Sequence, residues 1–337
     1  MPTLPPSTGA RDRDGYCSGM GDRTSQIVDS IDLATAKGLE LGPLANPVVR
    51  RSDGDIRYLD HVDTDTLRAR YASHVGFDVD AIVPIDYVIG NGSIQTAVGD
   101  DAPFDYVVAS HVIEHVPDMI SWLHDVRSVL VDGGVLSLAI PDHRYCFDAL
   151  RSPTVAADLV HAYLDHAIIP SPRQVFDHYS SAVAWRGLIA WNDEVPFDEL
   201  VAVHSEPEAL ERATAAAATG EYVDVHCWVF TPRSFCRVVH SLQRLQLVPF
   251  SIETCTETIG GEFLATLRTA DPAAAIVPAV ARGSPRAAEA AVVREELTEA
   301  RSALASANVE LAAMKRSRSW QITTPLRTLN ALRSRGR

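Results

Sequence analysis

The sequence predicts an α/β fold with an open, mainly parallel sheet. Two short apolar runs, at 38–41 and 56–61, carry Glu40 and Asp60 near their ends. A third apolar run starts at Phe104, and an amphipathic stretch at 118–130 follows it. Short buried runs that alternate with helical periodicity are typical of parallel strands joined by crossover helices. Because ligands bind at the carboxyl ends of such strands, we expect Glu40 and Asp60 at a binding edge.

The remaining elements follow from turn and cap signals. Asp63 or Thr64 is a suitable N-cap, Pro117 suits the first turn of a helix, and Asp132-Gly133-Gly134 forms a turn. We expect helices at 26–37, 63–74, 118–130, 158–166, 207–219 and 232–245. We expect strands at 38–41, 56–61, 86–89, from 104, and at 135–140, 222–230, 249–255 and 262–268.

The turn after the first strand points to the class of ligand. It contains one glycine, Gly42, followed by Pro43, whereas dinucleotide-binding turns use three glycines to bring a pyrophosphate against the backbone. Residues 47–55 are too few for a crossover helix of the usual length. The carboxylate of Asp60 can accept hydrogen bonds from both hydroxyls of a ribose. We therefore expect a cofactor with a ribose and no phosphate, and S-adenosylmethionine fits.

Four motifs occur in the order that one superfamily uses. After the Gly42 turn come Phe104-Asp105-Tyr106-Val107, Glu114-His115-Val116-Pro117-Asp118, and Leu130 with Gly133-Gly134. This order resembles class I S-adenosylmethionine-dependent methyltransferases of the type 11-like branch, over roughly 26–150 and 222–270. The resemblance implies a Rossmann-like seven-stranded sheet whose last two strands, 249–255 and 262–268, form an antiparallel edge pair. It implies Glu40 near the methionine end of the cofactor and Asp60 on its ribose. The cofactor-binding positions expected are Glu40, Gly42, Pro43, Asp60, His61, Asn91, Ser110 and His111.

Composition divides the chain into five predicted segments. They are a disordered N-terminus (1–25), a methyltransferase domain (26–270) with a helical insertion over the acceptor site (151–221), a linker (271–290), a coiled-coil helix (291–316) and a basic tail (317–337). The coiled-coil seam contains two alanines, so it would need a homo- or hetero-oligomeric partner; a solvated helix docked on its own domain is the alternative. Residues 319–327 resemble a tail found after coiled coils in bacterial enzymes of surface-polysaccharide assembly. Such a tail could contact an anionic membrane surface or a partner enzyme, or be disordered.

Net charge and cysteine content limit the possible partners and the expected cellular compartment. The net charge of −14 argues against a nucleic-acid partner, because phosphate binding needs a basic face. The five cysteines lack a C-x-x-C pair and are interpreted as reduced thiols. No apolar run approaches the ~20 residues of a membrane span. We expect a cytoplasmic protein, with peripheral contact at the inner face of the plasma membrane as an option.

Three histidines lie where an acceptor should bind, and each has an acid nearby in sequence. They are His143 after Asp142, His178 after Asp177, and His226 two residues after Asp224. An imidazole oriented by a carboxylate suits a general base near neutral pH. The candidate catalytic residues are His143, His178, His226 and Asp142. A divalent ion held by such histidines is an option, but we predict no metal.

His111-Val112-Ile113-Glu114-His115 also matches H-x-x-E-H, an inverted zinc-protease motif that needs both histidines on one helical turn. Pro117 argues against a helix that continues through this stretch. The function expected is therefore methyl transfer, with a sugar hydroxyl of a bacterial surface polysaccharide or its precursor as acceptor. The alternatives are methylation of a small metabolite, or a catalytically silent scaffold for polysaccharide enzymes.

Overall fold

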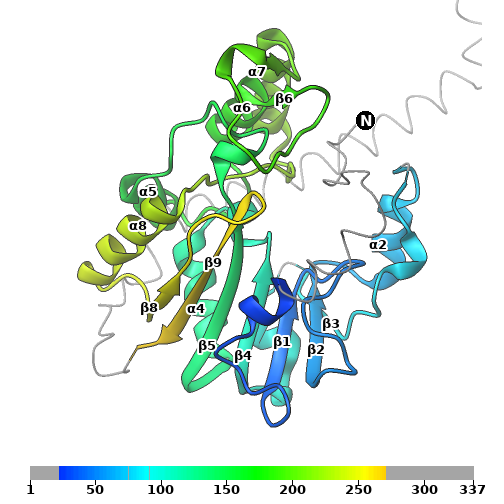
Figure 1. Cartoon of the computed structure of the whole chain (residues 1–337), viewed down its shortest axis with the longest axis vertical. Coiled ribbons are helices and arrows are strands. Elements are labelled where there is room, and N and C mark those ends of the chain that lie inside the picture. Colours follow the sequence, from blue (N-terminus) through cyan, green and yellow to red (C-terminus); the bar gives the residue numbers. More distant parts are fainter. Residues whose placement is uncertain (1–22, 75, 91, 271–337) are drawn as a thin grey trace, which may run out of the picture. The chain divides into compact units, whose positions relative to one another are not determined.

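The computed structural model describes residues 23–74, 76–90 and 92–270 (Figure 1). Its centre is a seven-stranded sheet with the strand order β3-β2-β1-β4-β5-β9-β8. Strands β1 to β5 pair in parallel, and β9 pairs antiparallel with both β5 and β8. This order confirms the predicted fold class, including the antiparallel edge pair. The predicted linker, coiled coil and basic tail lie outside the described residues and stay predictions.

The strand bounds agree with the sequence except at two places. They are β1 (Lys37–Leu41), β2 (Asp55–Asp60), β3 (Tyr87–Val88), β4 (Phe104–Ser110), β5 (Leu130–Pro141), β8 (Phe250–Cys255) and β9 (Glu262–Thr269). The strand predicted at 135–140 begins at Leu130, so the turn predicted at Asp132-Gly133-Gly134 lies within this strand, where its pairing register shifts. The strand predicted at 222–230 is wrong. This segment is irregular, with one isolated bridge between Phe230 and Asp142, because its backbone groups bond to several different loops.

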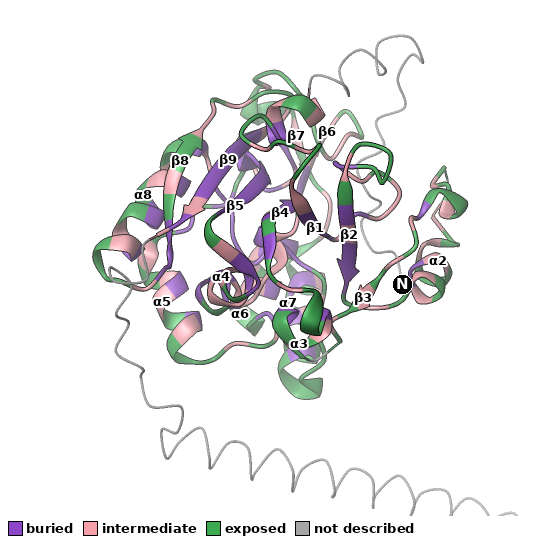
Figure 2. Cartoon of the chain, turned by 90° about the horizontal axis from the view of Figure 1, so that it is seen from below, coloured by how far each residue is buried: buried purple, intermediate pink, exposed green. Residues whose placement is uncertain are grey.

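Helices alternate with the strands of the sheet along the chain. They are α2 (Thr64–Tyr71), α3 (Ile94–Val98), α4 (Met119–Ser128) and α8 (Pro232–Arg244). Four 3₁₀ turns also occur here: η1 (Val79–Ala81), η2 (Gly99–Asp101), η3 (Ile113–His115) and η4 (His143–Tyr145). Another, η5 (Phe197–Glu199), lies in the insertion. Buried residues concentrate on the central strands and on the inner faces of these helices (Figure 2). No helix in the described part of the chain is long and apolar enough to cross a bilayer.

Of the helices predicted near the N-terminus and after Pro117, one is wrong and one is confirmed. A helix predicted at 26–37 is wrong: residues 23–27 are helical and turns follow. The Asp32 carboxylate accepts hydrogen bonds from the Ala34 N–H (3.2 Å) and the Thr35 hydroxyl (2.9 Å), which favours a turn over a helix. The helix after Pro117 is confirmed. Asp118 caps α4 by accepting a hydrogen bond from the Ser121 N–H at 2.9 Å.

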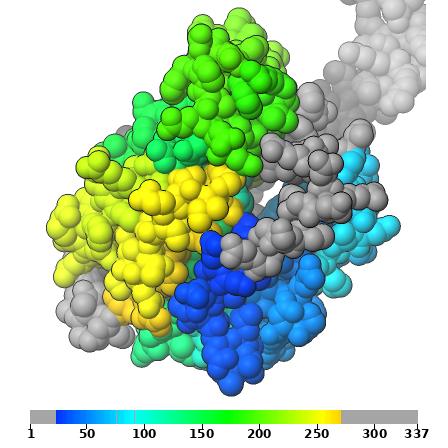
Figure 3. Space-filling view, in the orientation of Figure 1, coloured from blue at the N-terminus to red at the C-terminus, as the bar shows by residue number. Residues whose placement is uncertain are grey.

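The insertion is richer in structure than predicted. It contains α5 (Ala156–Leu164), α6 (Pro172–Ser181), a hairpin of β6 (Val183–Trp185) and β7 (Leu200–Ala202), and α7 (Glu206–Thr219). The expected helices correspond to α5 and α7, whereas α6 and the hairpin are additional. Figure 1 shows α6, α7 and β6 beyond the carboxyl ends of the central strands. In space-filling form the insertion (green) projects next to the β8–β9 connection (yellow) (Figure 3).

Candidate functional site

The first turn of the sheet is built around Gly42. Its φ is +65°, a left-handed conformation that favours glycine. A Cβ at this position would lie 3.2 Å from Cγ2 of Val112. The Gly42 N–H donates to the Leu59 carbonyl at 2.9 Å, which keeps the turn against β2. Pro43, which follows, is buried. A bare backbone therefore lies at the carboxyl end of β1, as a close-fitting ligand requires.

The Glu40 side chain fixes the loop that contains this turn. Its carboxylate accepts hydrogen bonds from the N–H groups of Val48 (2.7 Å) and Val49 (3.0 Å), and the residue is 1% exposed. Burial raises the pKa of Glu40 to about 7, although the two hydrogen bonds oppose the rise. The side chain thus holds the loop that follows β1. The expectation that Glu40 lies near the methionine end of the cofactor stays a prediction.

The raised pKa of Glu40 predicts a pH-dependent stability. A buried acid whose pKa rises from 4.5 to about 7 stabilises the fold below pH 4.5, and this contribution is lost as the pH rises through 7. We expect the free energy of unfolding of the parent to fall between about pH 5 and about pH 8. The fall should be smaller in Glu40→Gln, by up to about 3 kcal/mol. Urea denaturation at both pH values measures it. The partly exposed Glu253→Gln should behave as the parent, and equal pH dependence of parent and Glu40→Gln would contradict the assignment.

Asp60 lies at the carboxyl end of β2 and is 6% exposed. Its Oδ1 accepts hydrogen bonds from the His61 backbone N–H (2.7 Å) and from His61 Nδ1 (2.5 Å). Arg70 donates to Nε2 of the same ring, so His61 is a fixed neighbour of Asp60. Among the described residues no donor contacts Oδ2 of Asp60, and this oxygen remains for a ligand hydroxyl. Asn91, also expected near the cofactor, is outside the described residues.

The end of β4 carries a histidine between two acids. His111 has a φ of +55°, and its Nε2 lies 2.8 Å from Oε2 of Glu262, while Nδ1 lies 3.5 Å from Oε1 of Glu114. Burial alone would lower the pKa of His111, but Glu114 and Glu262 raise it to about 9. The raised pKa favours the protonated imidazole at neutral pH, a form that cannot accept a proton. Arg23 donates to the Ser110 hydroxyl (2.9 Å) and to Glu262 (2.8 Å).

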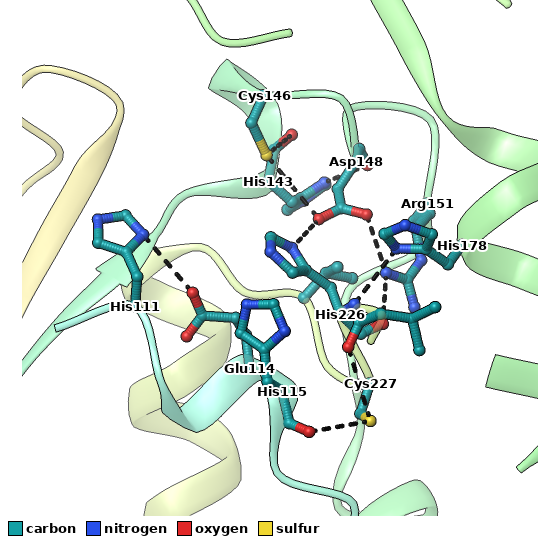
Figure 4. A network of polar contacts seen from close by, with 12 residues as sticks. His111, Glu114, His115, His143, Cys146, Asp148, Arg151, His178, His226 and Cys227 are labelled. Carbon is teal, nitrogen blue, oxygen red and sulfur yellow. Dashed lines mark hydrogen bonds and ion pairs between the residues drawn. The ribbon is translucent and has the colours of Figure 1, made fainter. Parts of the chain in front are cut away.

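Three further side chains meet just behind this histidine, and we call them the acid–histidine cluster: Glu114, His115 and His226 (Figure 4). The two imidazole rings lie edge to face, with centroids 4.7 Å apart and planes at 89°. Nδ1 of His115 contacts Asp224 at 2.8 Å, and Nδ1 of His226 contacts Asp148 at 2.5 Å. Glu114 is 1% exposed, and among the described residues neither of its carboxylate oxygens has a hydrogen-bond partner.

The irregular segment after the insertion brings His226 into this cluster. The N–H groups of Cys227 and Trp228 both donate to the Glu114 carbonyl, at 2.7 and 3.2 Å. The Trp228 indole N–H donates to the Val116 carbonyl at 2.6 Å. The 226–230 backbone is thereby tied to η3, although more than 100 residues separate the two in sequence. The pairing of His226 with Glu114 is a product of this crossing.

The expected histidine–acid pairs do not form between sequence neighbours. Asp142 contacts Arg144 (2.6 Å) and Thr258 (2.5 Å) instead of His143. Likewise, Asp177 contacts Arg151 (2.9 Å) instead of His178, and Asp224 contacts His115. This corrects the proposal that each acid orients the histidine beside it, because the Arg151, Arg144 and His115 side chains are closer donors.

The side chains of His143 and His178 contact backbone groups of the protein. Nδ1 of His143 lies 3.4 Å from the Asp148 carbonyl, and burial lowers the pKa of this imidazole. His178 accepts the His226 N–H at 3.2 Å on Nδ1, and burial lowers its pKa to about 3. Of the three predicted histidines, only His226 enters the acid–histidine cluster.

Asp148 and Arg151 support the cluster and have no sequence signal. They are 1% and 4% exposed, and Nη1 of Arg151 donates to Asp148 (2.8 Å) and to the His226 carbonyl (2.9 Å). Burial alone would raise the pKa of Asp148, but His226 and Arg151 hold it well below its usual value. Glu114 and His115 did carry a signal, because they form part of the H-x-x-E-H string. That string does not form an α-helix: Ile113–His115 form the single 3₁₀ turn η3, and α4 starts only at Met119.

A comparison with protein families identifies the chain. A family model described as a methyltransferase domain matches residues 31–243, which is more than half of the chain. The chain belongs to this methyltransferase family. It is an S-adenosylmethionine-dependent methyltransferase. The residues present are compatible with this cofactor, because Asp60 has an oxygen without a described donor and the Gly42 N–H donates to Leu59, next to Asp60. Their contacts with the cofactor stay predictions.

This methyltransferase was also compared with curated proteins and with solved structures. No curated protein matches the chain. Similar solved structures include the CurJ carbon methyltransferase (10% identity, TM-score 0.34, covering 72% of this chain and 51% of that one). An S-adenosylmethionine-dependent methyltransferase from Mesorhizobium loti has 15% identity and a TM-score of 0.36, covering 74% and 100%. CcbJ from Streptomyces caelestis has 12% identity and a TM-score of 0.38, covering 74% and 95%.

Proposed function

We propose that this methyltransferase methylates a hydroxyl of a small-molecule acceptor, and that the acceptor is a sugar of a bacterial surface polysaccharide or its precursor. The observation that carries the hydroxyl acceptor is the acid–histidine cluster, which follows β4, two strands from Asp60 in the sheet. The two imidazoles and the carboxylate of this cluster can each accept a proton. We propose that the acceptor hydroxyl binds beside them. The support for a sugar is the resemblance of residues 319–327 to tails of polysaccharide enzymes.

The rate of methyl transfer depends mainly on how the acceptor oxygen is positioned relative to the methyl group of the cofactor. The bound cofactor supplies a methyl group on a sulfonium, and Asp60 would hold its ribose while the Gly42 turn lies along it. Alignment of an acceptor oxygen with such a methyl group supplies roughly 7–11 kcal/mol of the barrier reduction. A proton acceptor adds about 3–5 kcal/mol, which corresponds to a factor of roughly 10²–10⁴. We propose that His226, oriented by Asp148, faces the acceptor hydroxyl.

The acceptor class is tested with the full chain and radiolabelled S-adenosylmethionine. One panel contains nucleotide-linked and lipid-linked sugars, and a second contains small hydroxylated metabolites. We expect label to appear in the sugar panel as an O-methyl ether, identified by mass spectrometry. Label in the metabolite panel alone would favour the small-metabolite alternative. Binding of the cofactor without transfer to either panel would favour the scaffold alternative.

The His226→Gln variant tests the role of the acid–histidine cluster in turnover. We expect kcat to fall at least about 10²-fold while the Kd for S-adenosylmethionine stays unchanged, because His226 would act on the acceptor and not on the cofactor. His161→Gln is the matched control, since this exposed histidine lies on α5 outside the cluster. A His226→Gln enzyme with parental kcat would contradict the role.

A further inference from the structure

The geometry points to a site for one divalent transition-metal ion, with Zn²⁺ as the representative ion, in the acid–histidine cluster. We infer that the Glu114 carboxylate, Nε2 of His115 and Nε2 of His226 are its ligands. One ligand atom from each of the three residues lies within 4.8 Å of the other two. Metal–ligand bonds of about 2.0–2.1 Å place tetrahedral ligands about 3.3 Å apart, so small side-chain rotations would close the site.

Hydrogen bonds at the far side of each ring fix which nitrogen faces the cluster. Nδ1 of His115 is 2.8 Å from Asp224, and Nδ1 of His226 is 2.5 Å from Asp148. A neutral imidazole that donates from Nδ1 presents a lone pair at Nε2. Carboxylates that hold metal-binding imidazoles in this way are the usual partners of such ligands, because they set the tautomer and the ring orientation. Both rings of the cluster have this arrangement.

Glu114 supplies an independent reason for a cation. The residue is 1% exposed, and neither carboxylate oxygen accepts a hydrogen bond from any described residue. The nearest cationic atom, Nδ1 of His111, is 3.5 Å from Oε1. A buried carboxylate without hydrogen bonds is costly. A cation bound at one point would interact favourably with the two imidazole lone pairs and with the Glu114 carboxylate.

The ligand set favours a transition metal over Mg²⁺. Imidazole nitrogens suit Zn²⁺ and similar ions, whereas Mg²⁺ prefers oxygen ligands. Three protein ligands leave a further coordination position, as in catalytic zinc sites. If the proposed function holds, the ion would lie beside the acceptor hydroxyl and make its proton easier to lose to solvent. With the ion bound, His226 would be its ligand and would no longer be the proton acceptor. The oxygen would then form the new bond to the methyl carbon while the carbon–sulfur bond breaks and its electron pair returns to sulfur.

The test measures binding of the metal alone to the full-length, tag-free chain. After chelator treatment and removal of the chelator, Zn²⁺ is titrated by calorimetry and the bound metal is counted by elemental mass spectrometry. We expect one ion per chain in the parent, and affinity at least about tenfold weaker in both Glu114→Gln and His115→Gln. Co²⁺ in place of Zn²⁺ should give visible absorption bands in the parent that both variants lose. His161→Gln is the control and should match the parent.

Several outcomes would overturn the site. They are the absence of a bound ion in the parent, parental affinity in both variants, or loss of binding in Cys227→Ser with retention in Glu114→Gln. Circular dichroism and thermal unfolding of each variant separate loss of ligands from loss of fold. Because neither S-adenosylmethionine nor an acceptor is present, failure of metal binding leaves the proposed methyl transfer standing. Conversely, failure of methyl transfer leaves a measured metal site standing.

Discussion

An Asp60→Ala variant is expected to bind S-adenosylmethionine roughly 10²–10⁴-fold more weakly than the parent. Each hydrogen bond between a hydroxyl and a charged acceptor contributes about 1.5–3 kcal/mol, and a ribose offers two such hydroxyls. Asp60 is 6% exposed, so water replaces the lost acceptor poorly. Isothermal titration calorimetry of the full chain with S-adenosylmethionine measures the change.

Asp55→Ala is the matched control for this experiment. Asp55 lies at the amino end of the same strand, where its exposed carboxylate pairs with Arg57 at 2.6 Å. This variant removes the same charge from β2 but from the edge opposite the proposed site, and it should keep parental affinity. Thermal unfolding without ligand should show both variants folded. Parental affinity in a folded Asp60→Ala protein would rule out the ribose role.

Replacement of Arg151 by Met is expected to lower the free energy of unfolding by about 3–5 kcal/mol. The guanidinium side chain is 2% exposed and pairs with Asp148, which is 1% exposed, and with Asp177. Removal of one member of a buried pair leaves the other charge without compensation, and this is among the most destabilising of single changes. Urea or guanidinium denaturation monitored by circular dichroism measures the loss.

Two further variants identify the origin of this effect. Arg186→Met removes a surface arginine whose side chain is 68% exposed, and it should cost about 0–1 kcal/mol although it also breaks an ion pair, with Glu199. Adding Asp148→Asn to Arg151→Met should recover part of the loss, because the unpaired buried charge is then gone. If Arg151→Met costs no more than Arg186→Met, the buried network contributes no stability.

The sheet could be predicted because its signals are local. Gly42 after β1 and Asp60 at the end of β2 are each set by neighbours in the sequence. Local signals also existed for α6, where Ser171 and Gln174 form a capping box, and this helix was missed. The 222–230 segment was predicted wrongly, because an apolar, aromatic-rich run looks the same whether it pairs in a sheet or crosses loops.

The partners of the buried charges required the tertiary structure. The order of strands and helices along the chain could largely be predicted from the sequence, and the binding edge that contains Asp60 stays a prediction. Only the folded chain decided that Asp148 holds His226, 78 residues away, and that Asp224 holds His115, 109 residues away. Sequence patterns constrain residues a few positions apart, whereas the partner of a buried charge depends on where distant segments cross. Glu114 shows the difference: its place in H-x-x-E-H was visible from the start, but the two imidazoles beside it were brought together by folding.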